Sequence, residues 1–136
     1  MSISTIRIAA VIGTILLMAR IPADAHHAFA AEFDSGKPVV LSGTVRNVEW
    51  LNPHAHFYII VKDASGGSTR WELELASPNV LLRQGWTRYS LKEGDVVTVN
   101  GYLARDGSRL AAARMVRFTD NRTVFFGDNG DGGPPK

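Results

Sequence analysis

The chain has no cysteine. Disulfide cross-links, thiolate metal ligands and thiol catalysis are therefore excluded. The chain also lacks a large excess of either charge, because 15 lysines and arginines stand against 13 aspartates and glutamates among 136 residues. Nucleic-acid binding by phosphate neutralisation requires a concentrated basic patch. We therefore expect no nucleic-acid partner.

Nor does any apolar run reach the roughly 20 residues that a bilayer-spanning helix requires. The apolar run Ile8–Ala19 follows a short, singly charged start and precedes Pro22 and the small-x-small triplet Ala23–Ala25. These parts predict a cleavable signal peptide over residues 1–25, with an uncleaved anchor as the alternative. We expect a periplasmic protein that begins at His26 and keeps no stable membrane anchor.

The remaining residues, 26–136, are enough for one domain with a single core. Loss of the leader removes two arginines and one aspartate, which leaves 13 basic and 12 acidic side chains. We divide this part into an N-terminal arm (26–38), a β-barrel domain (39–120) and a flexible C-terminal tail (121–136). Phe29 and Phe33 suggest that the arm packs against the domain, and the Gly-rich end cannot bury a core.

Alternating apolar residues and a high content of Val and Thr predict strands. The fifth strand has a helix as its rival because of its Ala run, but the Asp-Gly turn before it and its Met-Val-Arg-Phe end favour a strand. Ser77 as a cap, Pro78 in the first turn and Gly85 beyond the last turn predict one helix between the third and fourth strands. Gly43 predicts a bend or bulge in the first strand. The expected strands are Val39–Trp50, His54–Asp63, Thr69–Leu75, Val96–Leu103 and Leu110–Phe118.

Three strands, a helix and two further strands is the element order of the OB-fold, a partly open Greek-key barrel. The sequence therefore predicts an all-β domain with one helix, folded as a small OB-fold-like five-stranded barrel. Another small β-barrel or β-roll is the alternative.

Two of the four histidines of the mature chain lie two residues apart on the second strand. His54 and His56 therefore project from one face, about 6.6–6.8 Å apart at Cα. Strand alternation places Tyr58, Glu72 and Glu74 on that same face. Two imidazoles at this spacing can bind one metal ion, with a carboxylate as ligand or as hydrogen-bond partner of a ligand. Polar filler on a half-exposed strand, stacked on Trp50 or bridged to a glutamate, is the alternative.

The other two histidines, His26 and His27, open the expected mature chain. The α-amino group and imidazole of His26 can chelate one ion, and one further imidazole completes a three-nitrogen site that suits Cu(II). This arrangement resembles the histidine brace of exported copper proteins. A disordered end that merely follows a cleavage site is the alternative. Copper is the expected metal, and zinc the second choice.

The mature chain contains six distinctive motifs: His26–Phe29, Glu32–Asp34, Leu41–Val45, Val48–His54, Ser77–Asn79 and Gly85–Thr87. Together they resemble an uncharacterised family of small exported bacterial proteins, catalogued as a domain of unknown function. The resemblance implies an exported β-barrel and no established activity. The family pattern centres on the His-His start and the Asn-Pro-His turn, which favours His26, His27 and His54 over His56, where an aromatic residue often stands.

Three functions remain open at this point. The first is a periplasmic OB-like protein that binds a transition metal through its N-terminal and second-strand histidines. The second is a metal-free module of the cell envelope that binds a small ligand, a glycan or a protein. The third, a copper oxidase-type enzyme, ranks last because so short a chain offers no extended substrate platform, and we assign no catalytic residue.

Overall fold

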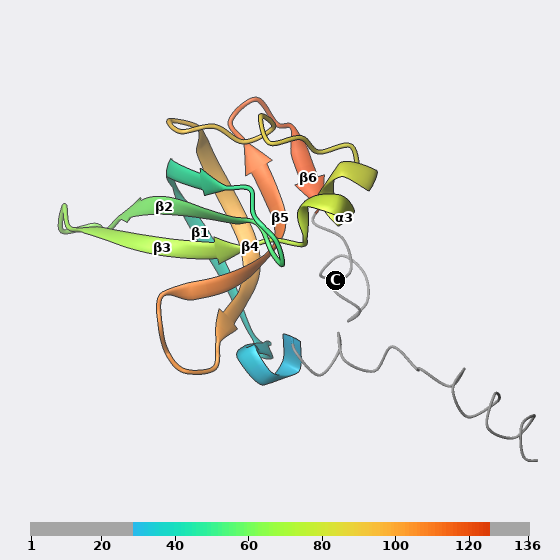
Figure 1. Ribbon diagram of the computed structural model, residues 1–136. Coiled ribbons are helices and arrows are strands. Elements are labelled where there is room, and N and C mark those ends of the chain that lie inside the picture. The colour runs from blue at the N-terminus through green and yellow to red at the C-terminus, as the bar shows by residue number, and fades with distance from the viewer. Residues whose placement is uncertain (1–28, 126–136) are drawn as a thin grey trace, which may run out of the picture.

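The structure is a computed structural model, and it describes residues 29–125. A helical turn at residues 29–32 precedes six strands and a short helix (Figure 1). The expected signal peptide, His26, His27 and residues 126–136 lie outside the described residues. The elements are β1 (Phe33–Glu49), β2 (His56–Lys62), β3 (Ser68–Glu74), α3 (Pro78–Arg83), β4 (Val96–Ala104), β5 (Leu110–Phe118) and β6 (Thr123–Phe125).

The sheet closes on itself. β1, β2 and β3 form an antiparallel meander, β1 also pairs with β4, β4 pairs with β5, and β5 returns to pair in parallel with β3. This ring, with α3 between β3 and β4, confirms the expected all-β fold with one helix between the third and fourth strands. No helix of the described part is both long and apolar enough to cross a membrane.

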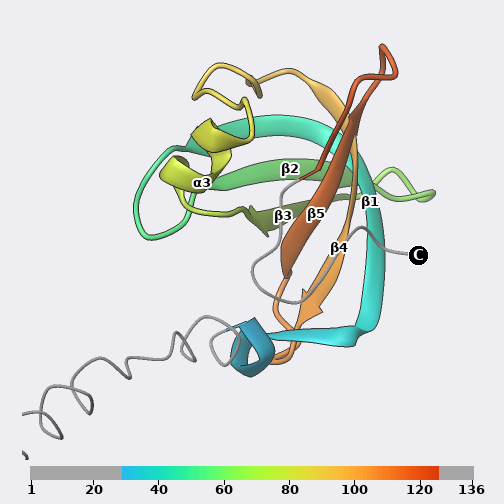
Figure 2. The ribbon, with the colours of Figure 1, turned by 90° about the vertical axis from the view of Figure 1, so that its right-hand side faces the viewer.

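β1 is longer than expected and is shared by two neighbours. Its first part pairs with β4 and its last part with β2, and Thr44 pairs with both Ile60 and Val96. Figure 2 shows the strand curving from the α3 side of the ring down to the helical turn. A Cβ at Gly43 would lie 2.5 Å from the Ile60 carbonyl oxygen, so glycine permits the close crossing of the two strands. The register shift itself follows between Val45 and Asn47.

The expected caps of the helix are confirmed. The Ser77 hydroxyl accepts a hydrogen bond from the Val80 N–H at 3.4 Å, and Pro78 occupies the first turn. Gly85 has a φ of +86°, a left-handed conformation that costs glycine nothing. Leu81 on this helix is fully buried, so α3 covers one end of the ring with an apolar side chain.

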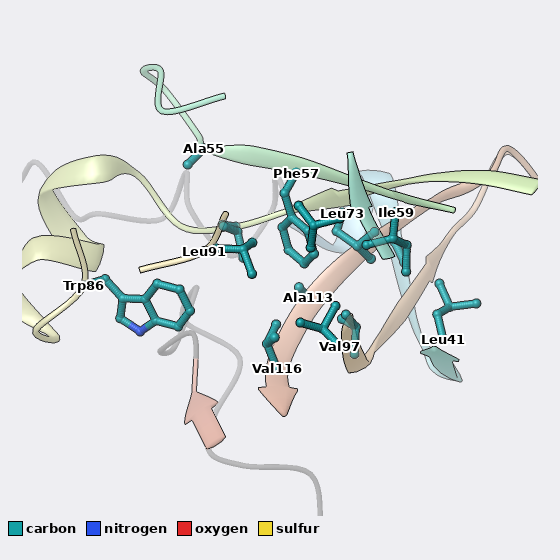
Figure 3. Close-up of a cluster of buried hydrophobic side chains, with 14 of the residues drawn as sticks. Leu41, Ala55, Phe57, Ile59, Leu73, Trp86, Leu91, Val97, Ala113 and Val116 are labelled. Carbon is teal, nitrogen blue, oxygen red and sulfur yellow. The ribbon is translucent and has the colours of Figure 1, made fainter. Parts of the chain in front are cut away.

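The predicted faces of the strands are also confirmed. Phe57, Ile59 and Leu73 point into the ring and have no exposed surface, while Trp71 is half-buried against the same core. Figure 3 shows Phe57, Ile59 and Leu73 facing Leu91, which precedes β4, and the β4 and β5 residues Val97, Ala113 and Val116. His54, His56, Tyr58, Glu72 and Glu74 therefore belong to the outer face of the β2–β3 hairpin.

β6 was not expected, because residues 121–136 read as a flexible tail. It pairs with β5 from Met115 to Arg117. The turn before it places Asn121 at a φ of 65°, and the Asp120 carboxylate accepts a hydrogen bond from the Arg122 N–H at 3.0 Å. Asp-Asn is a turn signal that the sequence contains. Three residues are too few to show an alternating pattern, so the strand itself gave no signal.

Candidate functional site

His54 lies at the entrance of β2, after a turn that contains the cis Asn52–Pro53 peptide. The backbone of Ala55 extends the β2–β3 ladder by one residue, since its N–H donates to Ala76 and its carbonyl accepts from Leu75. Ala55 is fully buried. The histidines on either side of it must therefore face outward, as strand alternation predicts.

His54 is paired with the most deeply buried carboxylate of this face. Its Nδ1 lies 2.6 Å from Oε1 of Glu74, whose side chain is 9% exposed, while the imidazole itself is 42% exposed. Burial raises the pKa of the Glu74 carboxyl above its ordinary value; the neighbouring His54 opposes this shift, and the Glu32 carboxylate adds to it. The pair thus joins a sheltered carboxylate to a histidine that solvent can reach.

His56 has a parallel but more open partner. Its Nδ1 lies 2.9 Å from Oε1 of Glu72, and the glutamate side chain is 39% exposed. The contact has an ion-pair distance, but its angles are not those of a hydrogen bond, and Nδ1 is shielded from solvent. Both pairs run diagonally across the hairpin, because the residues directly opposite are His56 with Glu74 and Tyr58 with Glu72.

Tyr58 links the second pair to β1. Its hydroxyl donates to Glu49 at 3.3 Å and to Glu72 at 3.5 Å, and the guanidinium of Arg70 lies 4.1 Å from the centre of its ring. Burial, followed by the charges of Glu72 and Glu49, raises the pKa of the Tyr58 phenol. Trp50, the other aromatic residue considered for this face, is half-buried and packs against the main core.

The described part of the N-terminal arm, from Phe29 onward, lies beside this face. Phe29 and Phe33 are buried in a second, smaller apolar cluster with Ala104 and Ala112. Ala112 on β5 pairs with Glu74 on β3, so the cluster and the His54–Glu74 pair occupy neighbouring strands. Packing of the two phenylalanines against the domain was expected from the sequence.

Two charged neighbours of the site were not predicted. The charge of Glu32 contributes to the raised pKa of the Glu74 carboxyl. The buried Arg114 lies against Phe29, with its guanidinium carbon 4.5 Å from the ring centre. An arginine within the small apolar residues of β5 is a signal that sequence reasoning could have used.

Within the described residues, the atoms of this site that could bind a metal ion are the Nε2 nitrogens of the two histidines. Within residues 29–125, Nε2 of His54 and of His56 has no hydrogen-bond partner, while Nδ1 of each faces a glutamate. In the same region, no group of three histidine, aspartate or glutamate side chains lies close enough to hold a metal ion. A metal at His54 would therefore need a ligand from elsewhere. His26 and His27 lie outside the described residues.

Comparison with protein families matches residues 14–113 to DUF6152, a family of unknown function. The chain belongs to this family. The expected resemblance to an uncharacterised domain is thereby confirmed. The match begins inside the expected signal peptide and ends within β5, so it includes His26, His27, His54 and His56. No curated protein matches the chain.

Proposed function

We propose that the chain is an exported periplasmic protein that binds a transition metal, copper before zinc, through His54 and the N-terminal His26. His27 or His56 would supply a further nitrogen. The observation that carries this proposal is the 2.6 Å contact between Nδ1 of His54 and the buried Glu74 carboxylate.

A carboxylate on Nδ1 prepares a histidine to bind a metal. It fixes the ring orientation, keeps the proton on Nδ1 and leaves Nε2 as the electron-pair donor. Metal-binding histidines almost always donate their other ring N–H to a carboxylate, a backbone carbonyl or a water molecule. His54 has this partner and is 42% exposed, so an ion can approach it.

The remaining ligands would come from the N-terminus. Phe29, in the helical turn, is buried in one cluster with Ala112 of β5, which pairs with Glu74, and His26 precedes Phe29 by three residues in the sequence. Three extended residues span about 10 Å. The α-amino group and imidazole of His26, with Nε2 of His54, would form a three-nitrogen set of the kind that Cu(II) prefers.

The test is a competition titration of Cu(II) on protein taken from the periplasm after natural cleavage. We expect one ion per chain. His54→Ala should lower the affinity by more than the 10–100-fold typical of a lost outer-sphere partner. His56→Ala is the matched control, with a smaller loss. Retention of Ala25 should lower the affinity as much as deletion of His26, because it removes the amine from its chelate ring.

Two results would contradict this function. An intact mass that gives a mature start other than His26 would remove the amine ligand. Tight binding that survives both the Ala25 extension and His54→Ala would remove the proposed ligand set. The outer face of the hairpin would then be the surface of a metal-free module that binds a small ligand or a protein.

A further inference from the structure

A small cleft lies between the end of α3 and the β5–β6 hairpin, which Figure 1 shows side by side. Gly85 and Ser90, from the segment after α3, line one wall, and Arg122 and Val124 line the other. The cleft has a volume of about 230 Å³. This is well above the roughly 10–15 Å³ that one water molecule requires and below the roughly 300–1,000 Å³ of sites for drug-sized ligands. The cleft therefore suits a small molecule.

Two buried aromatic side chains, those of Trp86 and Phe118, also line the cleft and fix its shape. They are 3% and 5% exposed and belong to the main core. The N–H of Trp86 donates to the Leu81 carbonyl at 2.9 Å, which holds the segment after α3 against the helix. The walls of the cleft are therefore set by packing within the protein, as is usual for small-molecule sites.

Arg122 is held in place with one edge of its guanidinium unoccupied. Its Nε donates to Oδ2 of Asp120 at 2.6 Å, and its guanidinium carbon lies 4.5 Å from the centre of the Phe118 ring. Within residues 29–125, Nη1 and Nη2 of Arg122 have no hydrogen-bond partner, and the side chain is 62% exposed. The N–H groups of a guanidinium form a planar fork that can bind both oxygens of a carboxylate.

A hydroxyl group lines the opposite wall. Oγ of Ser90 accepts a hydrogen bond from the Thr87 N–H at 2.9 Å, which fixes the position of the oxygen. Its contact with Oγ1 of Thr87 is 3.5 Å long, well beyond the usual distance between two hydroxyl groups. The Ser90 O–H can therefore donate to a ligand in the cleft.

The charge around the cleft favours an anion. The segments 83–90 and 118–124 carry three arginines and one carboxylate, that of Asp120. The hydrogen bond from Arg122 lowers the pKa of the Asp120 carboxyl, which therefore stays ionised and keeps the guanidinium oriented. A local excess of positive charge raises the concentration of anions near the cleft.

We propose that this cleft binds a small hydroxylated carboxylate, with the carboxylate on the Nη groups of Arg122 and a ligand oxygen on Ser90. Among the described residues that line the cleft, only Arg122 is charged, which suits one carboxylate better than a phosphate dianion. Gln84 and Ser90 are polar, so the body of the ligand should carry hydroxyl groups. None of these residues is a proposed metal ligand, so the inference goes beyond the proposed function and does not depend on it.

The test is a titration of the metal-free, cleaved protein at constant salt, followed by amide NMR. Glycerate and glycerol are the matched probes, because they share a three-carbon hydroxylated body and only glycerate has a carboxylate. Glycerate should shift the amide signals of Gly85, Ser90 and Arg122 to saturation. Glycerol should bind at least about 10-fold more weakly, as expected without a charge-assisted hydrogen bond. Inorganic phosphate should also bind more weakly than glycerate.

Three variants locate the site. Arg122→Gln should weaken glycerate binding at least about 10-fold. Ser90→Ala, on the opposite wall, should weaken it several-fold. Arg117→Gln is the matched control and should leave the affinity unchanged. Arg117 precedes Phe118 on β5, so its exposed side chain projects from the other face of the strand.

Several outcomes would overturn the site. No glycerate binding, equal affinity for glycerate and glycerol, or shifts confined to residues outside the cleft would each do so. Tighter binding of phosphate would overturn the carboxylate as its ligand. Equal losses in Arg122→Gln and Arg117→Gln would reduce the effect to general charge attraction. If the amide signals show that Arg122→Gln has lost β6, Ser90→Ala decides, and unchanged affinity in that variant would overturn the proposal.

Discussion

The two faces of the β2–β3 hairpin differ completely in character, although they alternate residue by residue along the same strands. The inner face carries Phe57, Ile59 and Leu73, all fully buried. The outer face carries two histidines, each beside a glutamate. The difference shows that one hairpin can supply both core packing and a polar site, because the strand period of two separates them. Substitutions on the inner face should therefore change mainly the free energy of unfolding, and substitutions on the outer face mainly the affinity for copper.

The largest effect should come from the inner face. Leu73→Ala removes a fully buried side chain from the centre of the core, so it should lower the free energy of unfolding by about 2–5 kcal/mol. Urea unfolding measures this. Arg70→Ala, on the outer face of the same strand, is the control and should cost less than about 1 kcal/mol. Equal costs would mean that the two faces are not energetically distinct.

On the outer face, Glu74→Gln should separate metal binding from folding. Loss of the carboxylate beside His54 should lower copper affinity about 10–100-fold, and Glu72→Gln should lower it less. A titration of both variants with Cu(II) measures this. Equal losses would show that burial of the carboxylate does not matter for the site.

The same substitution should have the opposite effect on stability without metal. Because the folded pKa of Glu74 is raised above 4.5, its protonated form stabilises the fold at acid pH, and this stability is lost as pH rises through the folded pKa. Glu74→Gln should therefore be more stable than the unaltered protein at pH 7, with the difference shrinking below pH about 4. Thermal unfolding in the presence of a chelator tests this. A difference that grows toward acid pH would contradict it.

The smallest effect concerns Tyr58. Its hydroxyl makes two long hydrogen bonds to carboxylates, so Tyr58→Phe should change the stability at pH 7 by less than about 1 kcal/mol. In an ultraviolet titration of the three tyrosines, one should ionise above the ordinary pKa of 10.0, and this late step should vanish in Tyr58→Phe. Since the folded pKa is raised, the linked stability is lost as pH rises through it.

Much of the fold followed from local patterns. The five expected strands, the capped helix and the outward direction of His54 and His56 rest on alternation and on Ser, Pro and Gly positions, which act over a few residues. The early start of β1 at Phe33 and the short strand β6 escaped prediction. Both depend on a neighbouring strand, since Phe33 pairs with Ala104 and β6 pairs with Met115–Arg117.

The sequence predicted which residues form the outer face of the hairpin, but it did not predict which histidine pairs with which glutamate. Alternation placed the histidines and glutamates on one face, yet it could not say that His54 would meet Glu74 and His56 would meet Glu72. The pairing depends on the register of the hairpin and on side chains long enough to contact a residue diagonally across it. Glu32 and Arg114 were missed because they come from segments far apart in the chain.

The sequence by itself determined which residues face inward, where the helix begins and ends, and that four histidines are available to this domain. These are local properties, set by backbone period and by the conformational preferences of single residues. Only the tertiary structure decided that Glu74 is buried beneath His54 while Glu72 stays open, and that Phe29 is clamped by Arg114. The burial and charge of a side chain depend on every element that packs around it. Ala112 of β5 pairs with Glu74, although the two residues lie nearly forty positions apart in the sequence.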